Sequence, residues 1–486
     1  MRKNWTRIFL GMLCFCLLTG GTASADRAER QAEAIPMRGI IEGFYGTPWS
    51  QEARLRMLQF MGKHALNTYI YAPKDDPYHR EKWREPYPEA QMEQLQLLIR
   101  TAQENQVEFV FGISPGLDLH FSGAAGEQDM KALLLKMNAL YNLGVRQFAI
   151  FFDDIQNKDA VAQTRVLNEV NRRFVHEKKG VKPLFTVPTE YFSADMMDTK
   201  GPKEYTGTFA ARLDPDVLVM YTGPGVVCPG IPLQDIEKIE HIYQRKMSVW
   251  WNYPVTDYMQ SKLALGPITG METGAAVHMA AFLMNPMEHE ALSELALATG
   301  ADYTNAPSTY DAEASWEKAL QEQYAGQAAD MKLFAEHSQH MENNWARAGR
   351  ADAPLLRAHM DALWQAVQTN ADTQAERTVL QADLKELAAG LQRLQTEPPR
   401  QLQQEGMPQL VLLQQLVQAD QDVLFLLQAD EAGQKHLADG FYQKLLRERD
   451  ALPSEAKVRI SDKTARAFLD EAIDWYEHKK LDLPVQ

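Results

Sequence analysis

The sequence has few cysteines. Only three of its 486 residues are cysteine, and Cys14 and Cys16 both lie within the first 25 residues. The remainder of the chain keeps Cys228 alone and can form no internal disulfide, so its stability must come from a hydrophobic core. No His lies at ligand or base spacing from Cys228, and we interpret it as a buried structural thiol rather than a nucleophile.

Basic residues are outnumbered by acidic ones. The formal net charge is -15 at pH 7, whereas nucleic acids and anionic membranes attract clustered Lys and Arg. We therefore predict no nucleic-acid partner. The sequence also lacks HExxH or paired-His spacing, so we predict no metal and no cofactor, and we treat a metal-dependent hydrolase as a weak alternative.

The apolar run at the N-terminus is short. Three basic residues within the first seven positions precede an apolar run over residues 8–18 and the small-residue site Ala23-Ser24-Ala25. This order is typical of a secretory signal peptide, and the run is well short of the ~20 residues that a spanning helix needs. We expect residues 1–25 to be cleaved. The mature protein is then secreted, periplasmic or on the cell surface, with no stable membrane anchor.

From residue 35 to about residue 307, short apolar runs alternate with amphipathic segments. The runs predict strands at Met37–Gly43, Leu66–Pro73, Val107–Ser114, Phe148–Asp154, Leu184–Glu190, Val217–Thr222, Met247–Asn252 and Val277–Asn285. Apolar residues at three- and four-residue steps predict helices at Arg54–His64, Met92–Asn105, Glu127–Tyr141, Val161–Val175 and Leu233–Tyr243.

Eight strands with intervening helices across roughly 270 residues predict an α/β fold, the (β/α)8 or TIM barrel, whose usual size is about 250 residues. A doubly wound open sheet is the alternative. No GxGxxG follows the first predicted strand, which removes the best reason to prefer that sheet. We assign residues 26–310 to this barrel.

After Pro307 the chain is rich in Ala, Gln, Leu and Glu and poor in aromatic residues. Helices are predicted at Ser315–Tyr324, Met331–Ala348, Leu355–Thr369, Ala375–Leu394, Leu410–Leu427, Leu437–Arg449 and Lys463–His478, with a break at Glu397-Pro398-Pro399. We expect residues 311–486 to form an all-α helical bundle. The sequence does not indicate whether this bundle serves stability, substrate approach or partner contact.

Two adjacent carboxylates, Asp153 and Asp154, follow the buried run Ala149-Ile150-Phe151-Phe152. Like charges side by side tend to raise one pKa, so the pair suits a general acid beside a partner that stays charged. A metal site or a solvated turn are the other interpretations. Because successive strand residues point to opposite faces, both acids can reach one ligand only if the strand ends or turns there.

Polar and aromatic residues also lie at the ends of the other predicted strands. Active sites of this fold lie at the carboxyl ends of the strands, where this chain has Lys74, Glu190-Tyr191, Trp250-Trp251-Asn252 and Asn285 among others. Aromatic faces stack on sugar rings, and carboxylates, amides and ammonium groups bind hydroxyls. The pattern therefore predicts a pocket for a polyhydroxylated ligand.

Six segments in order resemble glycoside hydrolase family 84, which comprises β-N-acetylglucosaminidases, including the O-GlcNAcases and secreted bacterial relatives. These segments begin at Gly39-Ile40-Ile41-Glu42-Gly43-Phe44-Tyr45-Gly46-Thr47-Pro48-Trp49, Tyr71-Ala72-Pro73-Lys74-Asp75-Asp76, Phe152-Asp153-Asp154-Ile155, Pro188-Thr189-Glu190-Tyr191, Trp250-Trp251-Asn252-Tyr253-Pro254 and Asn285-Pro286-Met287-Glu288-His289. The similarity covers residues 37 to about 310. The α/β domain that precedes the barrel in many secreted members and the acetyltransferase-like extension of the nucleocytoplasmic enzymes are expected to be absent.

The resemblance implies retaining hydrolysis of terminal β-linked N-acetylglucosamine by substrate assistance, in which the substrate's own 2-acetamido oxygen attacks the anomeric carbon and forms an oxazoline. By correspondence Asp153 holds the acetamido N–H. Asp154 protonates the leaving oxygen and then deprotonates the attacking water.

Seven further residues correspond to binding positions of the family. The resemblance implies close backbone approach to the sugar at Gly43, contacts to the acetamido group from Tyr191, Trp250 and Asn252, and hydrogen bonds to sugar hydroxyls from Lys74, Asp257 and Asn285.

Two other functions stay open at this stage. One is an endo-acting, hyaluronidase-like or chitin-directed hexosaminidase, which needs a groove that the sequence does not reveal. The other is a lapsed protein that binds N-acetylglucosamine without turnover. The expected partner in each case is a glycan or glycoconjugate, and the natural substrate, protein partners and oligomeric state are not indicated.

Overall fold

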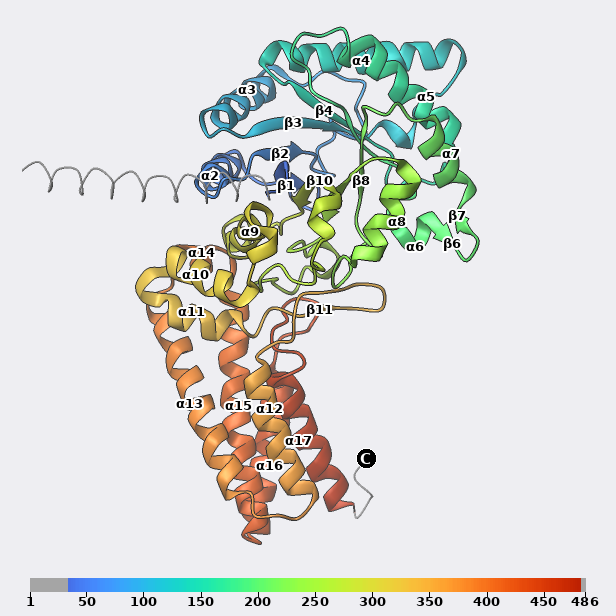
Figure 1. Cartoon of the computed structure of the whole chain (residues 1–486). Helices are drawn as coiled ribbons and strands as arrows, with labels where there is room; N and C mark the ends of the chain where they lie inside the picture. Colours follow the sequence, from blue (N-terminus) through green and yellow to red (C-terminus); the bar gives the residue numbers. More distant parts are fainter. Residues whose placement is uncertain (1–33, 482–486) are drawn as a thin grey trace, which may run out of the picture.

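The computed structural model describes residues 34–481 and contains a closed barrel of eight parallel strands. In chain order the strands are β1 (Met37–Glu42), β2 (Thr68–Tyr71), β3 (Glu108–Ile113), β4 (Gln147–Phe151), β5 (Phe185–Val187), β8 (Leu218–Tyr221), β9 (Met247–Trp251) and β10 (Met279–Met284). β1 pairs with both β2 and β10, which closes the barrel (Figure 1). The predicted fold class is confirmed, and every predicted strand overlaps one observed strand. The predicted signal peptide lies outside the described residues.

The strands form where the sequence has continuous apolar runs because both of their faces are buried. One face fills the barrel interior with residues such as Ile41, Ile70, Val110 and Phe185. The other face packs against the surrounding helices, as the buried Phe148 and Phe174 do with ring centroids 5.3 Å apart. Burial on two faces explains why these strands show no polar alternation.

The outer ring of helices agrees with the amphipathic segments. It contains α2 (Gln51–Lys63), α3 (Glu89–Glu104), α4 (Gly123–Leu143), α5 (Ala160–Val170), α7 (Glu204–Arg212), α8 (Leu233–Tyr243) and α9 (Glu290–Asn305). The side chains of Ser50 and Asp159 cap α2 and α5 by accepting from the backbone N–H three residues ahead. Helices α7 and α9 were not predicted. The nine residues of α7 include Gly207 and show too short an apolar pattern, and α9 is buried on nearly all sides and therefore has no clear polar face.

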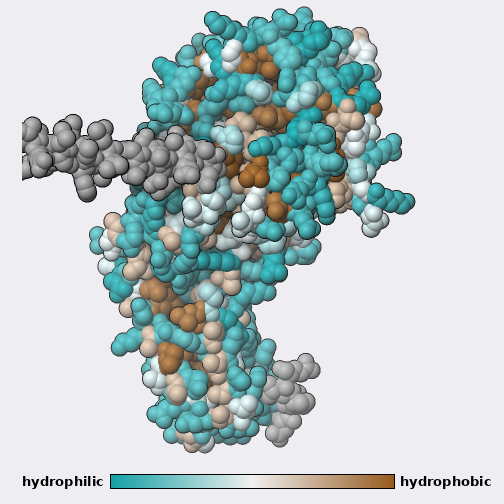
Figure 2. Space-filling model, in the orientation of Figure 1, coloured by the Kyte–Doolittle hydropathy of each residue, from teal (hydrophilic) through white to brown (hydrophobic). Residues whose placement is uncertain are grey.

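The C-terminal helices form a long bundle that extends away from the barrel (Figure 1). They are α10 (Ala312–Tyr324), α11 (Ala328–Ala335), α12 (Pro354–Gln368), α13 (Gln374–Thr396), α14 (Arg400–Glu405), α15 (Met407–Glu431), α16 (Lys435–Ala451) and α17 (Ala465–Lys480). Helix α15 is the one described helix long and apolar enough by composition to cross a membrane, yet 67% of its most apolar window is buried inside the protein. The face drawn in Figure 2 is mostly hydrophilic, with small hydrophobic patches on the barrel and on the bundle.

One predicted helix is wrong over most of its length. The range Met331–Ala348 was expected to be helical, but α11 ends at Ala335 and the chain then forms a hairpin of β11 (Met341–Glu342) and β12 (Arg347–Ala348). The Asn343 side chain stabilises the turn, because its oxygen accepts from the backbone N–H groups of Trp345 and Ala346 at 3.0 and 2.8 Å. Side-chain bonds of this kind compete with helix formation.

The barrel and the bundle meet over a continuous apolar core. The Trp316 indole of α10 is fully buried and donates to the carbonyl oxygen of Leu265 in the barrel at 2.8 Å. The hairpin β11–β12 lies at this junction, between the barrel and the tops of α12 and α17 (Figure 1). The boundary at residue 310 stays a prediction.

Candidate active site

A cavity of about 470 Å³ opens at the carboxyl ends of the barrel strands. Its lining includes every catalytic and binding residue that the family resemblance implied: Gly43, Lys74, Asp153, Asp154, Tyr191, Trp250, Asn252, Asp257 and Asn285. Glu190 and Trp251, which the strand-end pattern also placed in the pocket, do not line it: Glu190 accepts from the Thr206 hydroxyl, and Trp251 packs against Phe282. The residues that the resemblance implied come from six different strand ends, up to 242 positions apart in the chain. The fold therefore gathers them into one pocket, at the end of the barrel where the fold class predicts it.

The two adjacent acids reach the same cavity because the chain turns immediately after β4. The strand ends at Phe151, and Asp154 has a φ of +53°, in the left-handed region that few residues other than glycine adopt. The sequence analysis required such an end or turn for both acids to meet one ligand. Strained backbone of this kind persists where the surrounding structure holds it in place.

Asp153 is paired with the ammonium group of Lys74. Lys74 Nζ donates to Asp153 Oδ2, and both side chains are almost fully buried. The other carboxylate oxygen, Asp153 Oδ1, is buried and accepts no hydrogen bond from any described residue. A buried acceptor without a donor is costly, and a role in binding a ligand is one explanation for such a group in a pocket.

Asp154 accepts two phenolic hydrogen bonds. The Tyr45 hydroxyl donates to Oδ2 at 2.7 Å, and the Tyr191 hydroxyl donates to Oδ1 at 2.9 Å. Burial acts to raise the pKa of Asp154, but the charge of Lys74 and these two bonds outweigh it, so the pKa lies below its ordinary value. The expectation that repulsion between the acids would raise a pKa is therefore wrong for Asp154, because Lys74 offsets the repulsion.

A connected amide network forms another wall. Trp250 Nε1 and Asn285 Nδ2 both donate to Asn252 Oδ1, at 2.9 and 3.0 Å, and Asn252 Nδ2 donates to the carbonyl oxygen of Val226 at 2.9 Å. Asn285 Oδ1 in turn accepts from the Gly43 backbone N–H at 3.3 Å. Four of the predicted residues thus hold one another in a fixed arrangement.

Gly43 is required by close packing against this network. A Cβ atom built on Gly43 would lie 2.4 Å from Cζ2 of Trp250, far inside a normal contact. The absence of a side chain therefore lets the indole lie against the backbone at the floor of the pocket.

Asp257 follows β9 and lies across the pocket from β4, the strand that Asp153 and Asp154 follow. Its Oδ2 accepts from the Tyr45 backbone N–H at 2.9 Å. Burial raises the pKa of Asp257 above its ordinary value, although the backbone N–H groups of Tyr45 and Tyr258 lower it in part.

Three aromatic residues of the pocket were not predicted. Tyr45 and Tyr258 lie inside or next to the family-like segments, so their position offered a signal for both. Trp345 comes from the hairpin in the C-terminal region, with its ring centroid 5.3 Å from that of Tyr258 and 54% of the residue exposed. Nothing at strand-end spacing in the sequence indicates that Trp345 reaches the barrel.

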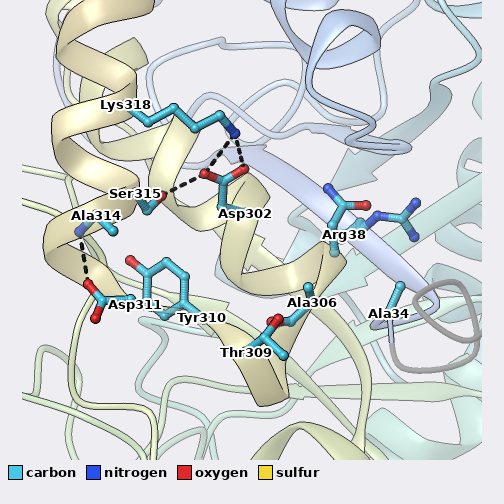
Figure 3. A pocket seen from close by; sticks show the side chains of 11 residues that line it. Ala34, Arg38, Asp302, Ala306, Thr309, Tyr310, Asp311, Ala314, Ser315 and Lys318 are labelled. Atoms are coloured by element: carbon cyan, nitrogen blue, oxygen red, sulfur yellow. Dashed lines mark hydrogen bonds and ion pairs between the residues drawn. The ribbon is translucent and has the colours of Figure 1, made fainter. Parts of the chain in front are cut away.

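A second cavity, of about 500 Å³, lies at the opposite end of the barrel (Figure 3). It is lined by Arg38 at the start of β1 and by residues of α9 and α10. Its carboxylate Asp302 is already bound by Lys318 at 2.9 Å and by the Ser315 hydroxyl at 2.8 Å. Active sites of this fold lie at the other end, so the cavity that holds Asp153 and Asp154 is the candidate active site.

Cys228 is buried next to Val226 and Val227, which line the candidate pocket. Burial raises the pKa of its thiol to about 11, so the group stays protonated at neutral pH. This agrees with the structural thiol that the sequence predicted.

The protein contains a (β/α)8 barrel, and its strand ends present two adjacent acids beside a wall of aromatic and amide side chains. These features together define a class of sugar-processing enzyme. Residues 38–336 match the family model described as beta-N-acetylglucosaminidase. The chain therefore belongs to this glycoside hydrolase family. Residues 355–469 match a second model, described as a hyaluronidase post-catalytic domain-like region.

Known proteins show the same relationship. The chain is 35% identical over 277 residues to the Protein O-GlcNAcase of Rattus norvegicus and 36% identical over 259 residues to that of Mus musculus. The matches cover 55% and 51% of this chain but only 29% and 28% of those proteins. The chain thus aligns with less than a third of the length of these relatives.

Two solved structures resemble most of the chain. The structure named CpGH84B has 40% sequence identity and a TM-score of 0.86, covering 90% of this chain and 77% of that chain. A mutant of the Thermobaculum terrenum O-GlcNAc hydrolase has 27% identity and a TM-score of 0.80, covering 92% of this chain and 96% of that chain. Both include the helical region as well as the barrel.

Proposed function

We propose that the protein is a retaining exo-β-N-acetylglucosaminidase that removes terminal β-linked N-acetylglucosamine by substrate assistance. The observation that carries this proposal is the environment of Asp153, whose buried Oδ1 has no donor among the described residues while Lys74 fixes Oδ2. The N–H of a 2-acetamido group supplies the donor that Oδ1 needs. The acetamido oxygen is then directed to the anomeric carbon.

In the first step the acetamido oxygen bonds to the anomeric carbon as the bond to the leaving oxygen breaks. Asp154 gives its proton to that oxygen, and Asp153 stabilises the positive charge that develops on the oxazoline nitrogen. In the second step Asp154 takes a proton from water, the water oxygen bonds to the anomeric carbon, and the oxazoline opens to the acetamide. The two displacements give net retention of configuration.

Asp154 must carry a proton for the first step, although its pKa is low in the unliganded site. A bound acetamido oxygen that accepts from the Tyr191 hydroxyl removes one of the two phenolic bonds that stabilise the Asp154 carboxylate. Loss of that bond raises the pKa of Asp154 on substrate binding. The ionised form, which the unliganded geometry favours, is the form that the second step uses.

The other residues have binding roles in this proposal. Trp250, Asn252 and Tyr191 enclose the acetamido group, while Lys74, Asp257 and Asn285 bind ring hydroxyls. Trp345, half exposed at the mouth of the pocket, offers an aromatic surface to the leaving group. The natural leaving group can be a protein, a peptidoglycan fragment or another glycan, because the residues named here mainly recognise one sugar.

The test compares wild type, Asp153→Asn, Asp154→Asn and the control Asp302→Asn on two aryl β-N-acetylglucosaminides, one with a good and one with a poor leaving group. Asp154→Asn is expected to lose about 10²–10⁴-fold on the poor leaving group and far less on the good one, because only the poor one needs an acid. Asp153→Asn slows both, and Asp302→Asn neither. Wild type that cleaves neither substrate, or full rates in both active-site variants, would contradict the proposal.

Two further measurements separate the alternatives. Faster cleavage of a long polymer than of the short aryl substrate favours an endo-acting enzyme, and sugar binding without turnover favours a lapsed one.

We also propose that the enzyme acts outside the cytoplasm, on the support of the N-terminal pattern that ends at Ala23-Ser24-Ala25. N-terminal sequencing of the protein from its native cells should begin at Asp26. An intact Met1 on the mature protein would contradict export by cleavage.

A further inference from the structure

The hairpin β11–β12 brings a residue of the C-terminal region to the catalytic pocket. Trp345 lies in its turn and contacts Tyr258, which follows the sugar-binding residue Asp257 directly. Two walls of the pocket mouth therefore come from different parts of the chain, one from the loop after β9 and one from the hairpin. Their separation decides whether a leaving group can lie against Trp345.

The base of the hairpin is held by a buried carboxylate. Asp352 Oδ1 accepts from the backbone N–H groups of Gln339 and His340, at 2.7 and 2.8 Å, immediately before β11 begins. The Thr464 hydroxyl, at the start of α17, donates to the Asp352 carbonyl oxygen at 2.8 Å. Asp352 thus fixes both ends of the hairpin segment relative to the bundle.

A buried lysine of the barrel, Lys262, binds Asp352 from the other side. Lys262 Nζ lies 3.0 Å from Asp352 Oδ2 and 3.2 Å from Asp462 Oδ2, and its side chain is only 1% exposed. Lys262 is in the same loop as Asp257 and Tyr258, and its backbone N–H donates to the carbonyl oxygen of Met259 at 3.0 Å. One ion pair therefore joins the loop of one pocket wall to the base of the other.

A buried ion pair is a poor way to gain stability, because desolvation of both charges cancels much of their attraction. The side chain of Asp352 is 0% exposed, so the full desolvation cost applies to it. What such a pair does supply is geometry, since each charge accepts only a few arrangements of its partners.

We propose that Lys262 and Asp352 are positioning residues that set the distance between Trp345 and the Asp257–Tyr258 loop, and thereby the selectivity of the enzyme for extended leaving groups. The inference rests on the proposed function. Neither residue touches the substrate. Loss of the pair lets the hairpin move away, so that a large leaving group loses its aromatic contact while the sugar keeps its own binding residues.

The test measures kcat/KM on two substrates, an aryl β-N-acetylglucosaminide with a one-ring leaving group and a peptide of about ten residues carrying β-N-acetylglucosamine on serine. The readout is the ratio of the two values, peptide over aryl. Trp345→Ala is expected to lower this ratio roughly 2-fold to 10-fold, the range of a single aromatic contact. The double variant Lys262→Met/Asp352→Asn is expected to lower it by the same factor, and adding Trp345→Ala to the double variant should lower it no further.

The double variant avoids a lone buried charge, because Asp462 keeps its bond from Arg459 at 2.7 Å. If it does not fold, Asp352→Asn alone decides the question by the same ratio. Lys444→Met is the control at a distant ion pair: Lys444, with 43% of its side chain exposed, pairs with the buried Asp422 at 2.6 Å between α16 and α15, away from the pocket residues. A purely structural pair would lower stability in both cases and leave the ratio at its wild-type value.

An unchanged ratio in the folded double variant, or in Trp345→Ala, overturns the inference and leaves the proposed function standing. Wild type that cleaves neither substrate contradicts the proposed function itself. A ratio that falls in the double variant and not in Lys444→Met, with no further effect of Trp345→Ala, supports the inference.

Discussion

Gly43→Ala tests the packing at the floor of the pocket with the smallest possible change. The added methyl group would lie 2.4 Å from Cζ2 and 2.7 Å from Cη2 of Trp250. Carbon atoms in contact prefer about 3.5–4.0 Å, so the indole must move by roughly 1 Å. Trp250 carries the hydrogen bond to Asn252, so this movement disturbs the wall that we assign to the acetamido group.

Overpacking of this kind costs about 1–3 kcal/mol where the neighbours cannot yield. In the unliganded protein the indole can move into the open cavity, so the free energy of unfolding should change by less than about 1 kcal/mol. In the complex the acetamido group occupies that space, and the cost appears in binding and catalysis. At 1.36 kcal/mol per tenfold, kcat/KM should fall about 5-fold to 150-fold.

The assay is kcat/KM on an aryl β-N-acetylglucosaminide together with urea denaturation of the same samples. Gly207→Ala is the control, because nothing lies within 4 Å of a Cβ at that position in α7. It should gain about 0.5–1 kcal/mol from helix propensity and keep its kcat/KM. A folded Gly43→Ala with wild-type kcat/KM would refute the packing argument.

Three further changes test other parts of the account. Tyr45→Phe removes a hydrogen-bond donor from the Asp154 carboxylate and so raises the pKa of Asp154. The alkaline limb of the pH profile of kcat/KM for a poor leaving group should therefore move to higher pH. Movement to lower pH would count against Asp154 as the acid. Burial raises the pKa of Glu294 from 4.5 to about 7, so its contribution to the free energy of unfolding falls as the pH rises through this range. Glu294→Gln should therefore be more stable than wild type at pH 8, by up to about 3 kcal/mol, with no such gain at pH 4, as thermal melts at both values would show. Arg54→Met leaves Glu42 buried without its two guanidinium bonds of 2.7 and 2.8 Å and should lose about 3–5 kcal/mol in urea denaturation; an unchanged midpoint would contradict the buried pair.

The barrel could be predicted from the sequence because its strands are continuous apolar runs and its helices are amphipathic. Both patterns follow from local burial, and both can be recognised without knowing which other segments the strands and helices pack against. The candidate pocket could be predicted from the same pattern, since Asp153 and Asn285, 132 positions apart in sequence, each lie at the carboxyl end of a predicted strand. Parallel strands bring such ends together whatever their separation in sequence.

The parts that were missed depend on tertiary contacts. The hairpin that carries Trp345 forms because Asn343 accepts hydrogen bonds within the turn and Asp352 accepts them from the segment before β11. Neither interaction produces a periodic pattern in the sequence. The lowered pKa of Asp154 depends on Lys74, which comes from a different strand end. Adjacency in the chain indicated repulsion, whereas the fold adds the charge that offsets it.

The central claim is that the substrate's acetamido oxygen is the nucleophile. The most direct test measures kcat/KM for aryl β-N-acetylglucosaminides whose acetyl group carries zero, one, two or three fluorine atoms. Because fluorine withdraws electrons from the carbonyl oxygen, substrate assistance predicts a steep, continuous fall in kcat/KM across the series, with the β-anomer of the sugar released first. Rates that do not depend on fluorine content, or initial release of the α-anomer, would contradict the mechanism.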